Sequence, residues 1–361
     1  MAVIETITLR LNEGASADAF AAANAKVESE YLPAQPGFNP GSRVTTLTDD
    51  GTWTISLRWD SAADADASMA VFSDAPATQD FLALVDASQM AMDRTVEVAS
   101  AASPALDNAR RLYMEGIRDG NARQAVETYT GDRYTQHSTG VRDGVEGFVE
   151  FFEPFIERNT DRNIEIVRSV VDGRFVFLQA AQELNGGESR WVTTDLFDTD
   201  GNHRIIEHWD VIHELGGTNP AGRTQVDGAT EITDLHLTEA NKAVVMRLMT
   251  EAFCEEPTAS FGDFISAETY MNHNPDAPDG LEALMEMDRM SRKSGERLFY
   301  KKVYQVVGQG NFVVSFAHQV WNDIDYAAFD IFRLEDGLIV EHWDNVETLP
   351  DPADLVNSGK F

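Results

Sequence analysis

The sequence predicts an α+β protein in which an N-terminal domain of alternating strands and helices precedes two copies of a second unit. The chain has 361 residues, which allows two or three domains with separate cores. One stretch, Ile206–Asp210, reads Ile-Glu-His-Trp-Asp, and Val340–Asp344 reads Val-Glu-His-Trp-Asp. Such internal repetition indicates that one architecture is used twice.

Composition limits the partners and the compartment. The 61 acidic and 28 basic residues give a formal net charge of -33, which repels nucleic acid and anionic membrane surfaces, so neither is expected as a partner. Cys254 is the only cysteine, which excludes an intrachain disulfide and a cysteine-based metal cage. The first residues do not resemble a signal peptide, and no apolar run approaches the roughly 18 residues of a membrane span. We therefore expect a cytoplasmic protein.

Residues 1–100 show the element order of a βαββαβ domain. Ser16 and Ser61 are placed to cap helices, and Asp49-Asp50-Gly51 is a hairpin signal. The expected elements are strands at 3–11, 43–47, 52–59 and 92–98 and helices at 20–31, 62–72 and 78–85. This order predicts a ferredoxin-like domain.

The same order, with the strand-to-helix junction Trp59-Asp60-Ser61, resembles the antibiotic-biosynthesis-monooxygenase-like domains of the dimeric α/β-barrel type. The resemblance implies a homodimer and, in some members, oxidation of aromatic substrates or haem with an Asn, a Trp and a His. No His precedes His137 and no Asn precedes Asn12, so we do not expect the haem-oxidising form. Trp53 and Trp59 share a strand face and serve either the core or a redox substrate.

The second region repeats at a nearly constant offset. Tyr134–His137 reads Tyr-Thr-Gln-His and corresponds to Tyr270–His273, which reads Tyr-Met-Asn-His. The predicted copies span 105–215 and 235–361. The stretch between them, 216–234, is rich in Gly, Thr and Pro and is expected to be a linker.

Each copy begins with helices and ends with an antiparallel meander. Such an order predicts a curved sheet wrapped on helices. Helices are expected at 107–118, 145–158, 238–253 and 281–291, the first capped by Asp107, and strands at 164–171, 175–184, 188–198, 205–214, 298–308, 312–321, 326–335 and 338–348.

The repeated motifs Tyr-x-x-His and Glu-His-Trp-Asp, together with Asp-Gly-x-Glu and Asp-x-Phe, resemble those of the SnoaL-like polyketide cyclases and of the predicted aldol-condensation enzymes related to them. Their cone-shaped fold is shared with nuclear transport factor 2, ketosteroid isomerase and scytalone dehydratase. The resemblance implies two tandem cone-shaped α+β domains after the ferredoxin-like domain. The fold hosts enzymes and binding modules alike, so it does not by itself define a reaction.

Aldol-type ring closure needs a base for a carbon acid and donors for the enolate oxygen. The resemblance places the catalytic carboxylate of the cyclases near the Asp-x-Phe strand, at Asp195 and Asp330. His318 on the neighbouring strand could pair with Asp330, whereas Ala181 stands at that place in the first copy. We therefore expect catalysis in the second copy, with His318 as a satisfied sheet histidine as the alternative.

Other side chains are expected to line the cavities. His208-x-Asp210 and His342-x-Asp344 could bind a metal, but only two ligands are evident at each place, so we expect neither a metal nor a cofactor. His137 and His273 could instead anchor loops. The candidates for binding a substrate are Tyr134, His137, Trp191, His208, Tyr270, His273, Tyr326 and His342.

The leading functional hypothesis is a cofactor-free lyase, isomerase or cyclase that acts on a small, polyketide-like molecule. One alternative is a non-catalytic protein that binds a small molecule in its cavities. Another is a cofactorless monooxygenase seated in the N-terminal domain.

Overall fold

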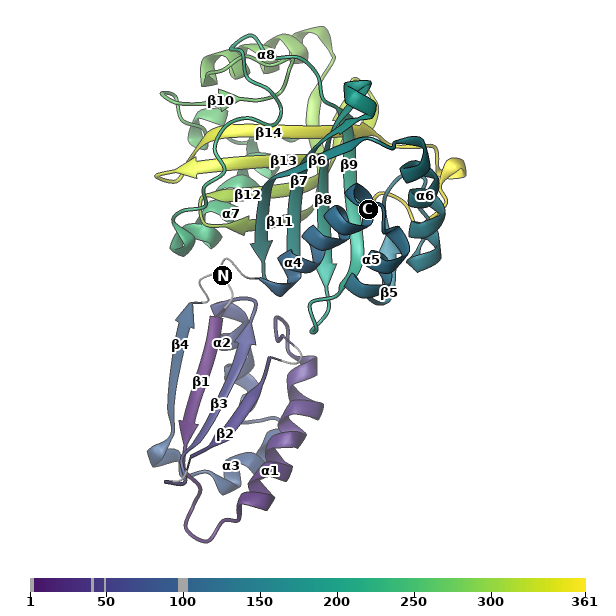
Figure 1. The fold of residues 1–361 in the computed structure, drawn as a ribbon. Coiled ribbons are helices and arrows are strands. Elements are labelled where there is room, and N and C mark those ends of the chain that lie inside the picture. Colours follow the sequence, from purple (N-terminus) through teal and green to yellow (C-terminus); the bar gives the residue numbers. More distant parts are fainter. Residues whose placement is uncertain (1–2, 40–41, 49, 97–102) are drawn as a thin grey trace. The chain divides into compact units, whose positions relative to one another are not determined.

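The computed structural model describes residues 3–39, 42–48, 50–96 and 103–361, and the chain divides into two compact units, 1–99 and 100–361. The first unit is a four-stranded antiparallel sheet of order β2-β3-β1-β4 (Figure 1). Ser16 and Ser61 cap its first two α-helices, as predicted. Asp49 of the predicted hairpin and positions 97–98 of the last predicted strand lie outside the described residues. Its elements are β1 (Val3–Leu9), α1 (Ala17–Lys26), β2 (Val44–Leu47), β3 (Trp53–Trp59), α2 (Ala62–Phe72), α3 (Gln79–Leu84) and β4 (Ala91–Val96).

The second unit contains two five-stranded sheets of matching order, β5-β9-β8-β7-β6 and β10-β14-β13-β12-β11. In each sheet a short parallel strand, β5 or β10, flanks the last strand of an antiparallel meander. We call residues 104–214 the first module and residues 235–348 the second module. Their strands are β5 (Thr130–Gln136), β6 (Arg162–Asp172), β7 (Phe175–Leu184), β8 (Ser189–Thr199), β9 (Ile205–Glu214), β10 (Met271–Asn272), β11 (Leu298–Gln309), β12 (Phe312–Trp321), β13 (Ile324–Glu335) and β14 (Leu338–Thr348).

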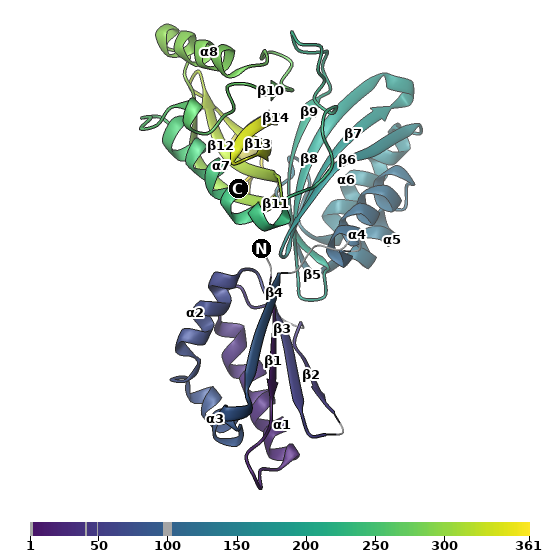
Figure 2. The same ribbon diagram turned by 90° about the vertical axis from the view of Figure 1, so that its left-hand side faces the viewer.

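The helices of each module cover the outer face of its sheet, and the two inner faces pack on each other (Figure 2). Side chains alternate along a strand, so β13 serves two cores. Phe329 and Ile331 point toward the first module's sheet, whereas Ala328 and Phe332 pack under the helices. The helices are α4 (Pro104–Arg111), α5 (Ala122–Tyr129), α6 (Gly144–Arg158), α7 (Thr238–Arg247) and α8 (Leu281–Ser294).

The first helix of the second unit starts earlier than predicted. Ser103, not Asp107, is the N-cap, because its side chain accepts a hydrogen bond from the Leu106 amide and Pro104 occupies the first turn. The helix then continues as a π-helix over Leu112–Arg118, which turns Tyr113 toward the sheet. None of the helices in the described ranges combines the length and the apolar character that a bilayer crossing needs.

Two segments cross between the modules. The linker segment (residues 215–234) follows the first module but packs on the second, where the Asn219 amide nitrogen donates to the Asn272 carbonyl at 2.6 Å. The tail segment (residues 349–361) follows the second module but packs on the first, where the Asn357 amide nitrogen donates to the Ser138 carbonyl at 2.8 Å. Each module is therefore completed by a segment that follows the other module in the chain.

The packing between the sheets yields a stability prediction. Phe329 is fully buried, with its ring centroid 4.5 Å from Phe316 and 5.7 Å from Phe177. Phe329→Ala should lower the free energy of unfolding of the second unit by about 3 to 5 kcal/mol, because it opens a cavity between the sheets. Urea denaturation followed by near-UV circular dichroism measures the loss. Trp321→Ala, at a site 49% exposed, is the control, and an equal loss in both variants would contradict this account of the packing.

Candidate functional site

A cavity of about 260 Å³ lies between the helices and the sheet of the first module. Its helical side is largely apolar apart from Tyr113, and most of its polar groups stand on or next to the sheet, so the polar chemistry is gathered on one wall. The apolar lining includes Leu112, Ile117, Phe148, Phe151, Phe152 and Phe155, and the polar lining includes Tyr113, Tyr134, Gln136, Ser138, Gln182, Thr193, Asp195, His208 and Asp210.

Asp195 and His208 form the centre of the polar wall. They stand on adjacent strands, β8 and β9, and the His208 Nε2 lies 3.0 Å from the Asp195 Oδ1. The other ring nitrogen, Nδ1, lies 2.9 Å from the Gln136 Oε1, and the ring stacks on Phe197 at 4.7 Å. Both ring nitrogens are therefore engaged, which fixes the ring in one orientation.

The second oxygen of Asp195 has no hydrogen-bond partner among the described residues, although it is buried. Burial raises the pKa of Asp195, and the hydrogen bond from His208 opposes the rise without cancelling it. A buried carboxyl group with one bare oxygen at a cavity is costly to keep. Such a group is a candidate for proton transfer to or from a ligand.

Asp210 lies beside this pair but in a different environment. Its Oδ2 accepts a hydrogen bond from the Ser138 hydroxyl at 2.6 Å, and its Oδ1 lies 3.0 Å from the Lys360 ammonium. Burial, the largest single influence, would raise the pKa of Asp210, but the Lys360 ammonium, the His208 ring and the Ser138 hydroxyl together outweigh burial and lower it. Two neighbouring carboxyl groups therefore have pKa values shifted in opposite directions, an arrangement that separates acid and base roles.

Two buried phenols complete the wall. The Tyr113 hydroxyl lies 2.7 Å from the Thr193 hydroxyl and accepts a hydrogen bond from Gln182 at 3.0 Å. The Tyr134 hydroxyl accepts one from the Gln136 amide at 2.8 Å. Burial and the charge of Asp195 raise the pKa of both phenols well above the ordinary value, so both stay protonated at neutral pH and are available as donors.

In the second module the corresponding carboxyl group is more fully bonded. The Asp330 Oδ1 accepts a hydrogen bond from the Tyr300 hydroxyl at 2.6 Å and lies 3.0 Å from the His342 Nε2. Its Oδ2 has the Ser315 hydroxyl at 3.5 Å. Here the His342 Nδ1 lacks a partner among the described residues, because Asn272 replaces the longer Gln136.

The protonation preferences of the second module also differ from those of the first. Burial, the largest single influence, favours the neutral ring of His342, but the hydrogen bond to Asp330 and the charges of Asp330 and Asp344 together outweigh burial and raise its pKa. Burial raises the pKa of Asp344, which is bonded to the Asn274 amide at 2.8 Å. The lowered pKa of Asp210 in the first module thus has no counterpart at Asp344.

The predicted pair of His318 and Asp330 is wrong. Asp330 faces Ser315 across β12 and β13, and His318 is three residues from Ser315, so its side chain emerges on the opposite face. There His318 bonds to Asp325 at 2.5 Å and stacks on Phe361. The sequence comparison with Ala181 aligned the strands correctly but could not show which face the histidine occupies.

The other predicted residues divide into two groups. Tyr134, Trp191 and His208 line the cavity, as expected. The prediction that His137 and His273 line cavities is wrong, because the two rings stack on Trp209 and Trp343 in the core between the sheets. Their anchoring role was the stated alternative.

In the second module the predicted binding residues have different surroundings. Tyr270 is buried in the core under the helices, and Tyr326 is half-buried beside Trp321. His342 is the one that contacts the buried Asp330.

The predictions did not single out Tyr113, Gln136 or Lys360. Gln136 stands inside the repeated Tyr-x-x-His phrase, so its exchange for Asn272 was a visible signal. Tyr113 occupies the place of Met249 in the repeat, a difference between the copies that the sequence also carries. Lys360 gives no local signal, because only the crossing of the tail segment brings it to Asp210.

Asp195, His208 and Asp210 offer ligand atoms within 4.8 Å of one another, which is compatible with a metal ion. The atoms that could bind a metal already have other partners, however. Both His208 nitrogens are hydrogen-bonded, and the Lys360 ammonium supplies the positive charge next to Asp210. The residues therefore fit a proton-sharing cluster better than a metal site.

The raised pKa of Asp195 gives a pH prediction. A carboxyl group whose pKa is higher in the folded state stabilises the fold fully below its unfolded pKa, and this contribution is lost as pH rises through the folded pKa. Asp195→Asn should therefore become progressively more stable relative to the wild type as pH increases from 4 to 8. Urea denaturation at several pH values measures the difference. Glu188→Gln, at an exposed site, is the control, and a pH-independent difference for Asp195→Asn would contradict the assignment.

Comparison with known proteins supports the SnoaL-like family for part of the chain. Residues 109–208, which include Asp195 and His208, match the family model of the SnoaL-like domain. A search of curated proteins gives no significant match.

The solved structures that resemble this chain each cover about a third of it or less. A protein named as a polyketide cyclase, from Bacillus cereus ATCC 10987, is 16% identical, with a TM-score of 0.29 over 33% of this chain and 82% of that one. SnoaB, a cofactor-independent oxygenase from Streptomyces nogalater, is 12% identical, with a TM-score of 0.24 over 28% of this chain and 98% of its own. A protein named as a ketosteroid isomerase, from Kribbella flavida DSM 17836, is 13% identical, with a TM-score of 0.27 over 32% of this chain and 84% of its own.

Proposed function

We propose that the first module is a cofactor-free acid–base catalyst that removes a proton next to a carbonyl group of a small, polyketide-like molecule. The reaction class is an aldol-type cyclisation, an isomerisation or a lyase reaction. The observation that carries the proposal is the buried Asp195, which lines the cavity with one bare oxygen beside His208. The match of residues 109–208 to the SnoaL-like domain supports it.

The hydrogen-bond network assigns the tautomer of His208. The Gln136 amide nitrogen donates to Tyr134, so its oxygen accepts, and the His208 Nδ1 must carry a proton to donate to it. The His208 Nε2 then shares one proton with Asp195. The pair exists either as a neutral acid with a neutral ring or as a carboxylate with an imidazolium.

In the charged form, Asp195 can act as the base. Its bare Oδ2 takes the proton from the carbon next to the carbonyl, and the electrons of the broken C–H bond form the enolate. The Tyr113 hydroxyl, which accepts from Gln182, can turn its proton toward the enolate oxygen. A neutral phenol next to an apolar wall is an effective donor to a developing oxyanion. The same proton on Asp195 can then be returned to the product.

The shape of the cavity agrees with a small substrate. Its volume of about 260 Å³ is below the roughly 300–1,000 Å³ of typical ligand pockets, and aromatic side chains form much of its wall. One or two fused rings with a carbonyl group match this size and lining.

The proposal moves catalysis from the second module, where the sequence pattern suggested it, to the first. Asp330 is held by Tyr300, His342 and Ser315, so no oxygen of it is left as open as the Asp195 Oδ2. The expected partner, His318, is on the other face of the sheet.

A non-catalytic binding protein would use the same cavity without turnover. It would hold an apolar ligand against Phe148 and Phe152 and need Asp195 only as a hydrogen-bonding group. Affinity and turnover therefore have to be measured together.

A specific observation also favours a second candidate, a cofactorless monooxygenase in the first unit. A cavity of about 220 Å³ there is lined by Trp59 and Arg43, and the buried Trp59 Nε1 has no hydrogen-bond partner among the described residues. An indole that is free to donate could orient an oxygen-bearing aromatic ring. Oxygen uptake that is lost in Trp59→Phe would support this candidate, and the absence of uptake with phenolic substrates would count against it.

The matched substitutions Asp195→Asn and Asp330→Asn test the catalytic proposal. The probe is 2-tetralone, a bicyclic ketone, and the measurement is deuterium incorporation next to its carbonyl in D₂O by proton NMR. Asp195→Asn should reduce the enzyme-dependent rate by at least about 100-fold, because a positioned general base contributes that much or more. Asp330→Asn should leave the rate nearly unchanged.

Binding of 2-naphthol, an aromatic analogue of the enol, is followed by fluorescence in the same variants. Retained affinity with lost exchange in Asp195→Asn is expected for a catalyst. Binding without any exchange in the wild type would favour the binding protein. The reverse dependence on the two aspartates would place catalysis in the second module.

A further inference from the structure

The tail segment places a lysine against Asp210, which lines the first-module cavity. The Lys360 ammonium lies 3.0 Å from the Asp210 Oδ1, 2.9 Å from the Asp210 carbonyl oxygen and 2.8 Å from the Glu347 Oε2. These three acceptors match the three donors of an ammonium group. Lys360 is 4% exposed, so the contacts form out of contact with bulk water.

Neighbouring residues of the tail hold Lys360 in this place. The Asn357 amide donates to the Ser138 and Val141 carbonyls, both at 2.8 Å. The His137 Nδ1 lies 2.5 Å from the Gly359 carbonyl oxygen. Phe361 stacks on Tyr304 with 4.3 Å between ring centroids. The lysine is thus delivered by a segment with anchors on both sides.

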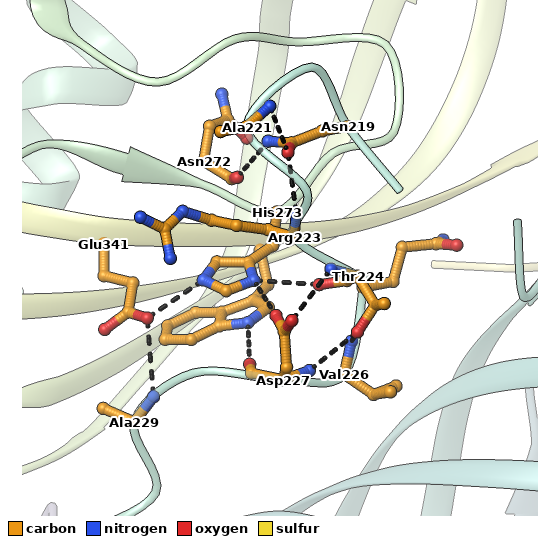
Figure 3. A network of polar contacts seen from close by, with 12 residues as sticks. Asn219, Ala221, Arg223, Thr224, Val226, Asp227, Ala229, Asn272, His273 and Glu341 are labelled. Atoms are coloured by element: carbon orange, nitrogen blue, oxygen red, sulfur yellow. Dashed lines mark hydrogen bonds and ion pairs between the residues drawn. The ribbon is translucent and has the colours of Figure 1, made fainter. Parts of the chain in front are cut away.

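The linker segment, which packs on the second module, carries a neutral residue at the matching position of its sequence. The His273 Nδ1 lies 2.8 Å from the Thr224 carbonyl oxygen of this segment (Figure 3). His273 and His137 correspond in the repeat, and each bonds through Nε2 to a glutamate of the last strand. The residue after Thr224 is Gln225, whereas the residue after Gly359 is Lys360. The two crossing segments therefore differ in charge at this position.

The two aspartates differ accordingly. Burial raises the pKa of Asp344 in the second module, where the crossing segment carries Gln225 at the sequence position of the lysine. Asp210 is also buried, but Lys360, together with His208 and Ser138, outweighs burial, and its pKa is lowered. The chain itself thus contains a comparison of the same carboxyl position with and without a lysine from the crossing segment.

We propose that Lys360 is a positioning residue of the first-module site, and that its ammonium group keeps Asp210 anionic next to His208. This inference rests on the proposed function. The ionised Asp210 attracts positive charge on the neighbouring His208 ring, whereas its repulsion of a second negative charge raises the pKa of Asp195. The charge of Asp210 therefore acts on both partners of the His208–Asp195 pair. A segment that follows the second module thus supplies the ammonium group that holds Asp210 ionised in the first.

Several other charged and titratable groups face Asp210 from the elements packed against it, and the charge of each affects the protonation of Asp210. They are His208 on the same strand, Asp195 on β8, Tyr113 on the π-helix, Tyr134 on β5, and Glu347 on β14 behind the lysine.

Lys360→Gln tests the inference by placing the residue of the linker segment in the tail. Full-length protein carrying ¹³C-labelled aspartate carboxyl groups is titrated by NMR, with the Asp210 signal assigned from Asp210→Asn. The Asp210 midpoint should rise by about 1 to 3 pH units, the usual effect of a charge at this distance. The acid limb of the 2-tetralone exchange profile should rise by a similar amount. Lys360→Arg should restore both.

Lys242→Gln is the matched control. Lys242 on α7 also forms an ion pair across the modules, partly shielded from water, with its Nζ 2.6 Å from the Asp172 Oδ2; neither residue lines the cavity. It should leave the Asp210 midpoint and the exchange profile in place, so a similar shift in this variant would overturn the inference.

An unmoved Asp210 midpoint in Lys360→Gln would also overturn it, whether or not the protein catalyses exchange. If the wild type shows no exchange but the midpoint rises and Lys360→Arg restores it, the role of Lys360 at Asp210 is supported, and the proposed function fails for this ketone.

Discussion

Strands that are buried on both faces impose the constraint on which the second unit depends. One face of each central strand must pack against helices and the other against the partner sheet, so both faces have to be largely apolar. Phe177, Phe316 and Phe329 satisfy this requirement between the sheets. On the outer faces some polar side chains are buried as well, and those of the first module gather at its cavity.

Because these strands are buried, several of their carboxyl groups lie in an apolar environment that disfavours the charged form. Each one is made tolerable in a different way: Asp210 by an ion pair, Asp330 by a phenol and a histidine, and Asp195 by one histidine with an oxygen left bare. Of these three carboxyl groups, only Asp195 has a buried oxygen that lacks a hydrogen-bond donor among the described residues. Since an unmet polar demand is costly in a folded protein, it is the best physical reason to place chemistry at Asp195.

The linker segment packs on the second module and the tail segment packs on the first, so each module depends on a segment that follows the other. Each module presents a histidine that bonds to a glutamate of its own last strand and to a backbone carbonyl of the segment that follows the other module. A module separated from its partner would lose this cover. The same arrangement lets one difference in sequence, Lys360 in place of Gln225, make the two sites electrostatically unequal.

The sequence by itself determined the order of the antiparallel strands, the repeated motifs and the candidate carboxylates Asp195 and Asp330, because hydrophobic periodicity and internal repetition are local signals. It also brought His208 and His342 into the candidate set. It did not predict the short parallel strands β5 and β10, whose pairing depends on distant residues. The tertiary structure decided which side of a strand a residue occupies and what lies against it. His318 fell on the wrong face for Asp330, and His137 turned toward a tryptophan instead of the cavity. Lys360 is 150 residues from Asp210 in the chain, and only the crossing of the tail makes them neighbours. Long-range contacts of this kind leave no periodic trace in the sequence, so the preference for the first module over the second came from packing alone.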